Sequence, residues 1–264
     1  MSTDGKLKGT IADIFCRFLA WWNPVRLVCA VYNGTARVRR LPEAVASAHL
    51  AWNESLWEKR KKELLQTARD GRTYLEYQHG MGRSEEKEPF LYGAGGRKFS
   101  RDLHADYNSC EVIAVYNLQT FLLGEAKESF PKLLQRFERK GAALGGAFGS
   151  TPAAVEQALE ESGFVWERLR GKACSRSAVD ALSRKYDAFI VMLYNDRTTL
   201  RAGVHTMCVT RFTKDGTTGY LMHNDYRSFG GKWYPTLHAA VEDYNGGKAG
   251  WLEVIGAKVK EETK

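Results

Sequence analysis

The sequence predicts an α+β domain, in which a block of helices precedes an antiparallel sheet. Up to about residue 185 the apolar residues recur at helical spacing, and later they alternate as in strands. Two alternating runs flank the turn signal Lys214-Asp215-Gly216, which favours a β-hairpin. Helices first and hairpin strands afterwards are typical of the α+β class. Since 44% of the 264 residues are hydrophobic, the chain can form a substantial core.

The first expected elements are helical. Residues 9–33 are predicted to form two short helices broken at Asn23-Pro24, and residues 42–70 one long helix closed by Gly71. The long helix carries an apolar stripe formed by Val45, Ala48, Trp52 and Leu56. We interpret this region as helices packed on the rest of the protein. Weak peripheral membrane contact through residues 9–33, with their Trp and Arg side chains, is the alternative.

The segment 79–101 is rich in glycine and charge and has few periodic apolar positions, which predicts a linker or exposed loop. We therefore expect a helical N-terminal arm over residues 1–88 and a second domain over residues 89–264.

A central buried helix is expected from Ser109 to Leu123, because its side chains are apolar on nearly all sides and Gly124 follows as a stop signal. Asn108 is its expected N-cap, and Glu111 the partner in a capping box. The remaining expected elements are helices over 151–163, 177–184 and 236–244, and strands over 187–195, 203–212, 217–225 and 251–259.

Charge and cysteine content limit the classes of function. The net charge of +8 permits an anionic partner, but the basic residues are mixed with acids, as in WEKRKKELL, and give no clear nucleic-acid signal. The five cysteines contain no CxxC pair, which indicates a reducing compartment. No secretory signal or apolar span of membrane length is present, so we expect a cytoplasmic protein.

Neither a cofactor nor a metal is indicated. His223, His238, Asp225 and Asp243 fit no strong metal-binding spacing. The glycine-rich pieces GAGGR and GAALGGAFGS lack the GK[ST] ending of a phosphate-binding loop, and we interpret them as flexible loops.

Cys110 is the first candidate for chemistry. In the first turn of a helix, its sulfur would lie among unpaired backbone N–H groups, which favour the nucleophilic thiolate. The alternative is a small buried side chain that only fills space.

A thiol nucleophile also needs a base and a group that orients that base. His205 lies on the first strand of the hairpin, and Asn224 and Asp225 end the second strand. Paired strands lie about 4.8 Å apart, so these side chains could meet. The alternatives are an ordinary sheet histidine and ordinary turn residues.

This order of residues resembles the papain-like cysteine peptidases, in particular the branch of bacteriocin-processing, double-glycine-cleaving peptidases and their uncharacterised relatives. The resembling pieces are NSCEVIAVYN, GSTPAAVEQALEESGF, DAFIVMLYN, GVHTMCVTRF and GYLMHND, within about residues 89–258. The resemblance implies a papain-like fold, with the cysteine on a central helix packed against an antiparallel sheet.

The resemblance also implies roles: Cys110 as nucleophile, His205 as general base and acid, and Asn224 as the orienting residue. The family usually carries glutamine six residues before the cysteine, where this chain has His104. His104, Asn108 and Asp225 are therefore the candidates for oxyanion binding or support.

The leading hypothesis is a cysteine peptidase or amidase that cleaves a peptide or amide substrate through an acyl-enzyme. An acyltransferase or transglutaminase-like enzyme with the same triad is the second hypothesis, and a non-catalytic basic binding module is the third. A further hypothesis is cleavage of this chain after Gly96, which would release the arm. The sequence predicts no oligomeric state.

Overall fold

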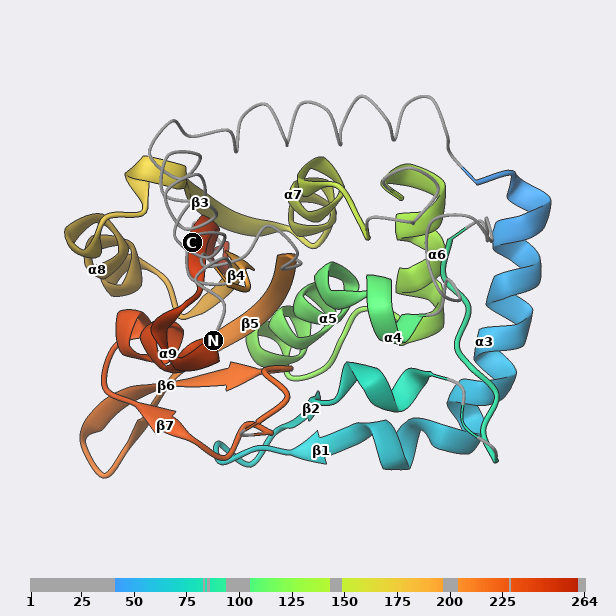
Figure 1. The fold of residues 1–264 in the computed structure, drawn as a ribbon, viewed down its shortest axis with the longest axis horizontal. Coiled ribbons are helices and arrows are strands. Elements are labelled where there is room, and N and C mark those ends of the chain that lie inside the picture. Colours follow the sequence, from blue (N-terminus) through green and yellow to red (C-terminus); the bar gives the residue numbers. More distant parts are fainter. Residues whose placement is uncertain are drawn as a thin grey trace, which may run out of the picture.

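The computed structural model describes residues 41–82, 84, 86–93, 105–142, 149–196, 204–227 and 229–260. The expected helices in residues 9–33, as well as His104 and Gly96, lie outside these ranges. The described residues form a mixed α+β structure with seven α-helices and a six-stranded antiparallel sheet (Figure 1). The α+β class predicted from the sequence is confirmed.

The sheet has the strand order β3-β8-β4-β5-β6-β7, and every neighbouring pair is antiparallel. Its strands are β3 (Phe164–Arg170), β4 (Ala188–Tyr194), β5 (Val204–Lys214), β6 (Thr217–His223), β7 (Trp233–Tyr234) and β8 (Gly250–Val259). The predicted hairpin is β5–β6, and its turn residues Asp215 and Gly216 have φ angles of 51° and 75°. The short strand β7 and the charged strand β3 were not expected.

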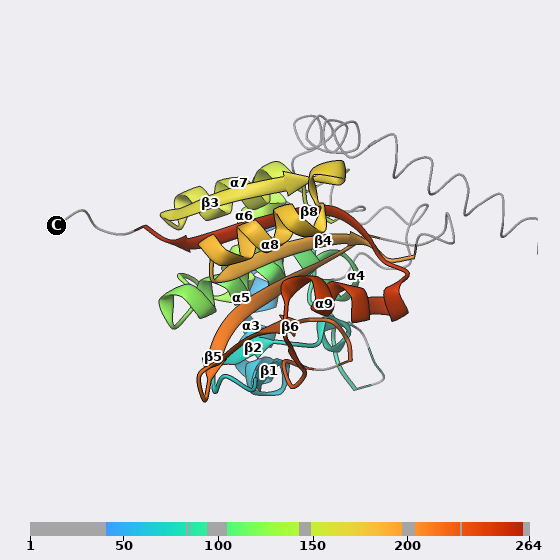
Figure 2. The same ribbon diagram turned by 90° about the vertical axis from the view of Figure 1, so that its left-hand side faces the viewer.

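Helices cover both faces of the sheet. On one face lie α5 (Cys110–Leu123), α6 (Phe130–Lys140) and α7 (Pro152–Glu161), and on the other α8 (Arg176–Lys185) and α9 (Leu237–Asp243). Figure 2 shows α8 and α9 in front of the strands, with α5 and α6 behind them. The two faces accordingly carry two separate hydrophobic clusters.

Capping side chains explain where three of these helices begin. Thr151, Ser175 and Thr236 each accept a hydrogen bond from the backbone N–H three residues on, which satisfies a free donor of the first turn of α7, α8 and α9. The predicted helices over 151–163 and 236–244 are confirmed. Helix α8 begins at Arg176, one residue before the predicted range 177–184, because Ser175 and not Ser177 is its cap. Helix α6 was not predicted.

Helix α5 is buried on nearly all sides, as its composition predicts, and it ends at Gly124. Its start differs from the prediction. The short helix α4 (Ala105–Asn108) precedes it directly, and the N–H and hydroxyl of Ser109 both bond to the Ala105 carbonyl. Ser109 therefore occupies the N-cap position, and the expected capping box of Asn108 with Glu111 is wrong.

The long N-terminal helix is shorter than predicted. Helix α3 (Glu43–Leu64) is followed by a hairpin of β1 (Leu65–Thr67) and β2 (Thr73–Leu75), and Gly71, with φ of 82°, belongs to the hairpin turn. The buried face is also displaced from the predicted stripe, since it consists of Ala46, Asn53, Leu56, Trp57, Arg60 and Leu64.

The described part of the expected arm is not a separate unit. Leu56, Trp57 and Leu75 belong to the same hydrophobic cluster as the apolar residues of α5 and α6. Phe90 and Tyr92, in the segment expected to be an exposed loop, are fully buried in that cluster, and η1 (Gln78–Met81) is a 3-10 helix. The expected boundary at 88/89 therefore does not divide two cores.

Of the helices described, none is both long and apolar enough to cross a membrane.

Candidate active site

Cys110 is the first residue of α5 and lies against β5. Its thiol donates a hydrogen bond to Oε2 of Glu111, with an Sγ–Oε2 distance of 3.3 Å. The N–H and hydroxyl groups of Thr206 on β5 lie beside the sulfur. Only 5% of the side chain is exposed, so a substrate reaches the sulfur only when neighbouring side chains move.

The environment of Cys110 favours the protonated thiol and not the expected thiolate. Burial raises the pKa of the Cys110 thiol well above its usual value, and the negative charge of Glu111 acts in the same direction. The contacts with Thr206 lower the pKa but do not offset burial. The resting thiol is therefore protonated at neutral pH, and a nucleophile forms only if a neighbouring group takes its proton.

Glu111 is a buried carboxylate without a cationic partner among the described residues. Burial raises its pKa to about 7, and its hydrogen bond from the backbone N–H of Ser150 is long, at 3.4 Å. Gly149 packs closely against it, since a Cβ at this position would lie 2.9 Å from Oε2 of Glu111. Gly149 also has φ of 70°, so glycine suits this position for both reasons.

Two polar atoms beside this pair have no hydrogen-bond partner among the described residues. They are Nδ2 of Asn108, whose side chain is 4% exposed, and Oγ1 of the fully buried Thr206. The Thr206 hydroxyl is near enough to lower the pKa of both Cys110 and Glu111, without a hydrogen bond of ordinary geometry. Buried polar groups are rarely left without partners, so these two atoms are exceptional among the described residues.

His205 is held by a different contact. Its Nε2–H donates to the main-chain carbonyl of Asn224 at 2.7 Å, so the lone pair of the neutral ring is on Nδ1. Burial lowers the pKa of His205 to about 4, which keeps the ring neutral at pH 7. The ring stacks on Tyr226, with a centroid distance of 4.7 Å.

Alternation along β5 puts His205 in phase with Met207 and Val209, and not with Thr206, which contacts Cys110. Thr206 and Cys208 face α5, whereas Met207 and Val209 belong to the cluster beneath α8 and α9. His205 alternates with the latter pair and stacks near Tyr244 of that cluster. Within the described ranges, no hydrogen bond joins Cys110 to His205, so the expected nucleophile and base are not paired in this structure.

Asn224 contacts His205 through its backbone, not its amide. The amide is engaged by Gln78: Oδ1 accepts from the Gln78 N–H, and Nδ2 donates to Oε1, both at 3.1 Å. This orientation differs from the one expected for a triad asparagine. Asn224 has φ of 63°, a left-handed conformation that asparagine tolerates better than most residues. Asp225 is buried, accepts from the N–H of Arg227, and slightly raises the pKa of His205.

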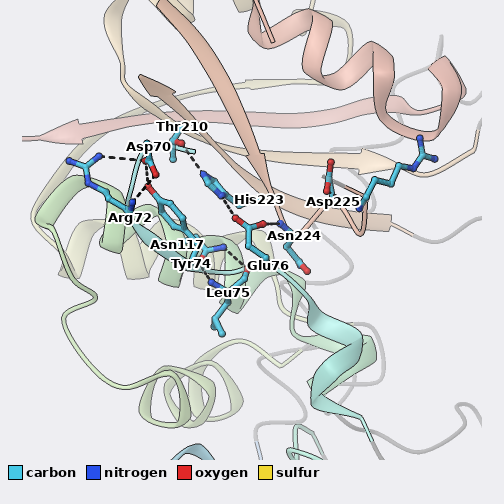
Figure 3. Close-up of polar contacts among 11 residues, drawn as sticks. Asp70, Arg72, Tyr74, Leu75, Glu76, Asn117, Thr210, His223, Asn224 and Asp225 are labelled. Atoms are coloured by element: carbon cyan, nitrogen blue, oxygen red, sulfur yellow. Dashed lines mark hydrogen bonds and ion pairs between the residues drawn. The ribbon is translucent and has the colours of Figure 1, made fainter. Parts of the chain in front are cut away.

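A buried polar network fixes the position of Asn224 (Figure 3). The carboxylate of Glu76 accepts hydrogen bonds from Nδ1 of His223 at 2.5 Å and from the N–H of Asn224 at 3.0 Å. Neither Glu76 nor Gln78 is predicted as a site residue from the sequence, because both lie in the segment expected to form a separate arm.

Among the described residues, no group of three or more His, Cys, Asp or Glu side chains is arranged to hold a metal ion. No protein-family model matches this chain, and no curated protein or solved structure is significantly similar to it.

Proposed function

We propose that the protein is a cysteine-dependent peptidase or amidase with Cys110 as the nucleophile. The observation that carries the proposal is the position of Cys110. It begins the central buried helix, contacts an antiparallel strand, and has the unpartnered Nδ2 of Asn108 two residues before it. This arrangement is similar to that of papain-like enzymes, in which a helix-borne cysteine lies against a sheet.

Asn108 would stabilise the developing negative charge. When sulfur attacks an acyl carbon, the carbonyl oxygen becomes an oxyanion that requires hydrogen-bond donors. A buried amide without a partner is already desolvated, so it gains a hydrogen bond in the transition state without losing another. His104, the other candidate donor, lies outside the described residues.

His205 would supply acid–base catalysis. With Nε2–H held by the Asn224 carbonyl, its Nδ1 lone pair can accept a proton from the thiol or from the water that releases the acyl group. Asn224 fixes the tautomer of His205 through its carbonyl and so keeps the orienting role expected of it. In the resting structure the thiol bonds to Glu111 and not to His205.

Acylation by p-nitrophenyl acetate tests the proposal without knowledge of the natural substrate. We expect the wild-type protein to release a burst of p-nitrophenolate and to gain one acetyl group on Cys110, located by peptide mass spectrometry. Cys110→Ala should lose both signals. Cys208→Ala is the matched control, because it removes another fully buried thiol. A wild-type protein without an adduct on Cys110 would contradict the proposal.

A further inference from the structure

The pair formed by Cys110 and Glu111 is unusual because it buries an unpaired carboxylate. In the part of the chain that the structure describes, neither lysine, arginine nor histidine pairs with Glu111. Removing a carboxylate from water without a cationic partner costs several kcal/mol, as an order of magnitude. Such strained ionisable groups gather at functional sites. The carboxylate is also directed at the one atom that the proposed reaction must deprotonate.

We propose that Glu111 is the general base of the site and receives the thiol proton of Cys110. The inference rests on the proposed function and reassigns one proton that His205 would otherwise take. Glu111 already accepts the hydrogen bond of the thiol at 3.3 Å, whereas the ring of His205 is bonded to Asn224. Proton transfer therefore needs no rearrangement on the side of Glu111.

The atoms and electrons of the reaction balance. As the Sγ–C bond forms, the thiol proton moves to Oε2 of Glu111, and the electron pair of the carbonyl moves to its oxygen beside Asn108. When the adduct collapses, the C–N bond breaks and Glu111 returns the proton to the leaving amine. Water then attacks the thioester, its proton passes to Nδ1 of His205, and from there it reaches the departing sulfur of Cys110.

Among the described residues, the titratable groups that interact with Glu111 include the Cys110 thiol, Tyr92 and Tyr226, and burial raises the pKa of each of them. Two further carboxylates lie near the tyrosines, Glu138 beside Tyr92 and Asp106 beside Tyr226. Ser150 and Thr206, which also face the carboxylate, carry no charge. Glu111, with a pKa of about 7, is therefore the member of this group that titrates near neutrality. A base works only when it is ionised, so acylation should become faster as the pH rises through 7.

The pH profile of acetylation of the full-length protein by p-nitrophenyl acetate separates the candidate bases. The leaving p-nitrophenolate needs no proton, so the rate reports only the deprotonation of the thiol. We expect the wild-type rate to rise with a midpoint near pH 7. A midpoint near 4 would identify His205, and a midpoint above 9 a free thiolate. Either of these two results would overturn the inference.

The variant Glu111→Gln provides a second readout. Without the base, acetylation at pH 7 should slow by about a hundredfold, as for loss of a general base, and the profile should follow ionisation of the thiol. The pKa of the Cys110 thiol, measured by the ultraviolet absorbance of the thiolate, should decrease in this variant, because the adjacent negative charge is gone. More thiolate would then be present although acetylation at pH 7 is slower. A merely structural role would not produce these opposite changes.

Glu138→Gln is the matched control, because Glu138 is a buried carboxylate on α6 that contacts His49 and Gly93 and not the thiol. Its acetylation midpoint should equal that of the wild type. If Glu111→Gln keeps the wild-type rate and midpoint, the inference fails while the proposed function stands. If Cys110 is never acetylated in the wild type, the proposed function itself fails. Should Glu111→Gln not fold, the wild-type midpoint still decides.

Discussion

The molecule buries two glutamates, Glu76 and Glu111, in contrasting ways. Glu76 is fully buried and accepts two good hydrogen bonds, from Nδ1 of His223 and from the N–H of Asn224. Glu111 is almost as buried, but the hydrogen bonds it accepts from other residues are weaker: one from a thiol and one from the Ser150 N–H at 3.4 Å, with the Thr206 hydroxyl nearby. The comparison teaches that burial alone does not define the role of a carboxylate. Its donors decide whether it stabilises the fold or remains available for chemistry.

Glu76 joins parts of the chain that are far apart in sequence. It follows β2, and its partner His223 ends β6, where Nε2 bonds to Oγ1 of Thr210 at 2.9 Å. The ring of Tyr74 stacks on His223 with a centroid distance of 3.9 Å. Because Asn224 in turn holds His205, the N-terminal hairpin helps to set the geometry of the candidate site.

Among the substitutions that test this contrast, Glu76→Ala should lower the free energy of unfolding the most. Two buried donors, Nδ1–H of His223 and the N–H of Asn224, would lose their acceptor. Leaving a buried donor without its acceptor typically costs about 1–3 kcal/mol, so the two donors together cost about 2–6 kcal/mol. We expect a decrease of this size in the free energy of unfolding, measured by urea denaturation monitored by circular dichroism.

Glu76→Gln is the matched control for shape. Its carbonyl oxygen can still accept from Asn224, and its NH₂ group can donate to His223 if that ring adopts the tautomer with hydrogen on Nε2. The hydroxyl of Thr210 can then accept instead of donate. We therefore expect a clearly smaller loss of stability than for Glu76→Ala. Equal losses in both variants would show that charge, and not satisfied hydrogen bonding, is what the network requires.

The pH dependence of stability tests the other carboxylate. Burial raises the pKa of Glu111 in the folded protein to about 7, above the value for an unfolded chain. The folded state then binds the proton more tightly, so this contribution is fully present below about pH 4.3 and is lost as pH rises through 7. The full loss amounts to roughly 4 kcal/mol.

Glu111→Gln cannot ionise and should lack that loss. The difference in unfolding free energy between Glu111→Gln and the wild type should therefore shift by about 3 kcal/mol in favour of the variant between pH 4.5 and 7.5. Urea denaturation at both pH values measures it. A difference that does not change with pH would show that Glu111 is not strained in the folded protein.

The parts of the fold that could be predicted from the sequence are those set by local signals. The β5–β6 hairpin and the helix starting at Pro152 depend on local signals, a turn glycine and a capping threonine, and these were predicted. The end of α3 at Leu64 has no such signal. Gly71, interpreted as the helix stop, serves the turn of a hairpin whose strands are only three residues long.

Burial of polar side chains could not be predicted either. Asn53 and Arg60 lie on the buried face of α3 because both side chains donate hydrogen bonds to distant main-chain carbonyls. The amide of Asn53 donates to the carbonyl of Leu91, and the guanidinium of Arg60 donates to the carbonyls of Glu88 and Gly80. These partners are brought there by the tertiary fold. Hydrophobic periodicity therefore predicted the helix, but not which of its faces is buried.

The candidate site shows the same limit. The position of Cys110 at the start of a central helix could be predicted, because it depends on a local pattern. Its raised pKa could not, since desolvation is a property of the folded environment. Alternation along the strand grouped His205 with Met207 and Val209, but the sequence could not show that these two apolar neighbours belong to the cluster beneath α8 and α9.

The smallest expected effect concerns the edge of the Glu76 network. The hydroxyl of Tyr74 donates to Oδ2 of Asp70 at 2.6 Å, and burial together with this bond raises its pKa. Tyr74→Phe keeps the ring stacked on His223 and removes only the hydroxyl. Asp70 retains the N–H of Arg72 as a donor at 3.0 Å, so no charge is left unpaired. We therefore expect a loss of about 1 kcal/mol in the free energy of unfolding, the usual net value of one hydrogen bond.

Tyr116→Phe is the control for Tyr74→Phe, because the Tyr116 ring packs on Trp57 and Phe130 while its hydroxyl bonds to none of the residues that the structure describes. Its unfolding free energy should stay within about 0.5 kcal/mol of the wild-type value. The two variants are compared by urea denaturation at pH 7. If they are equally stable, the hydroxyl of Tyr74 contributes nothing, and the contrast between the satisfied network and the open site is confined to Glu76, His223 and Asn224. If Tyr74→Phe instead costs as much as Glu76→Ala, the hydrogen bond to Asp70 is itself a principal support of the network.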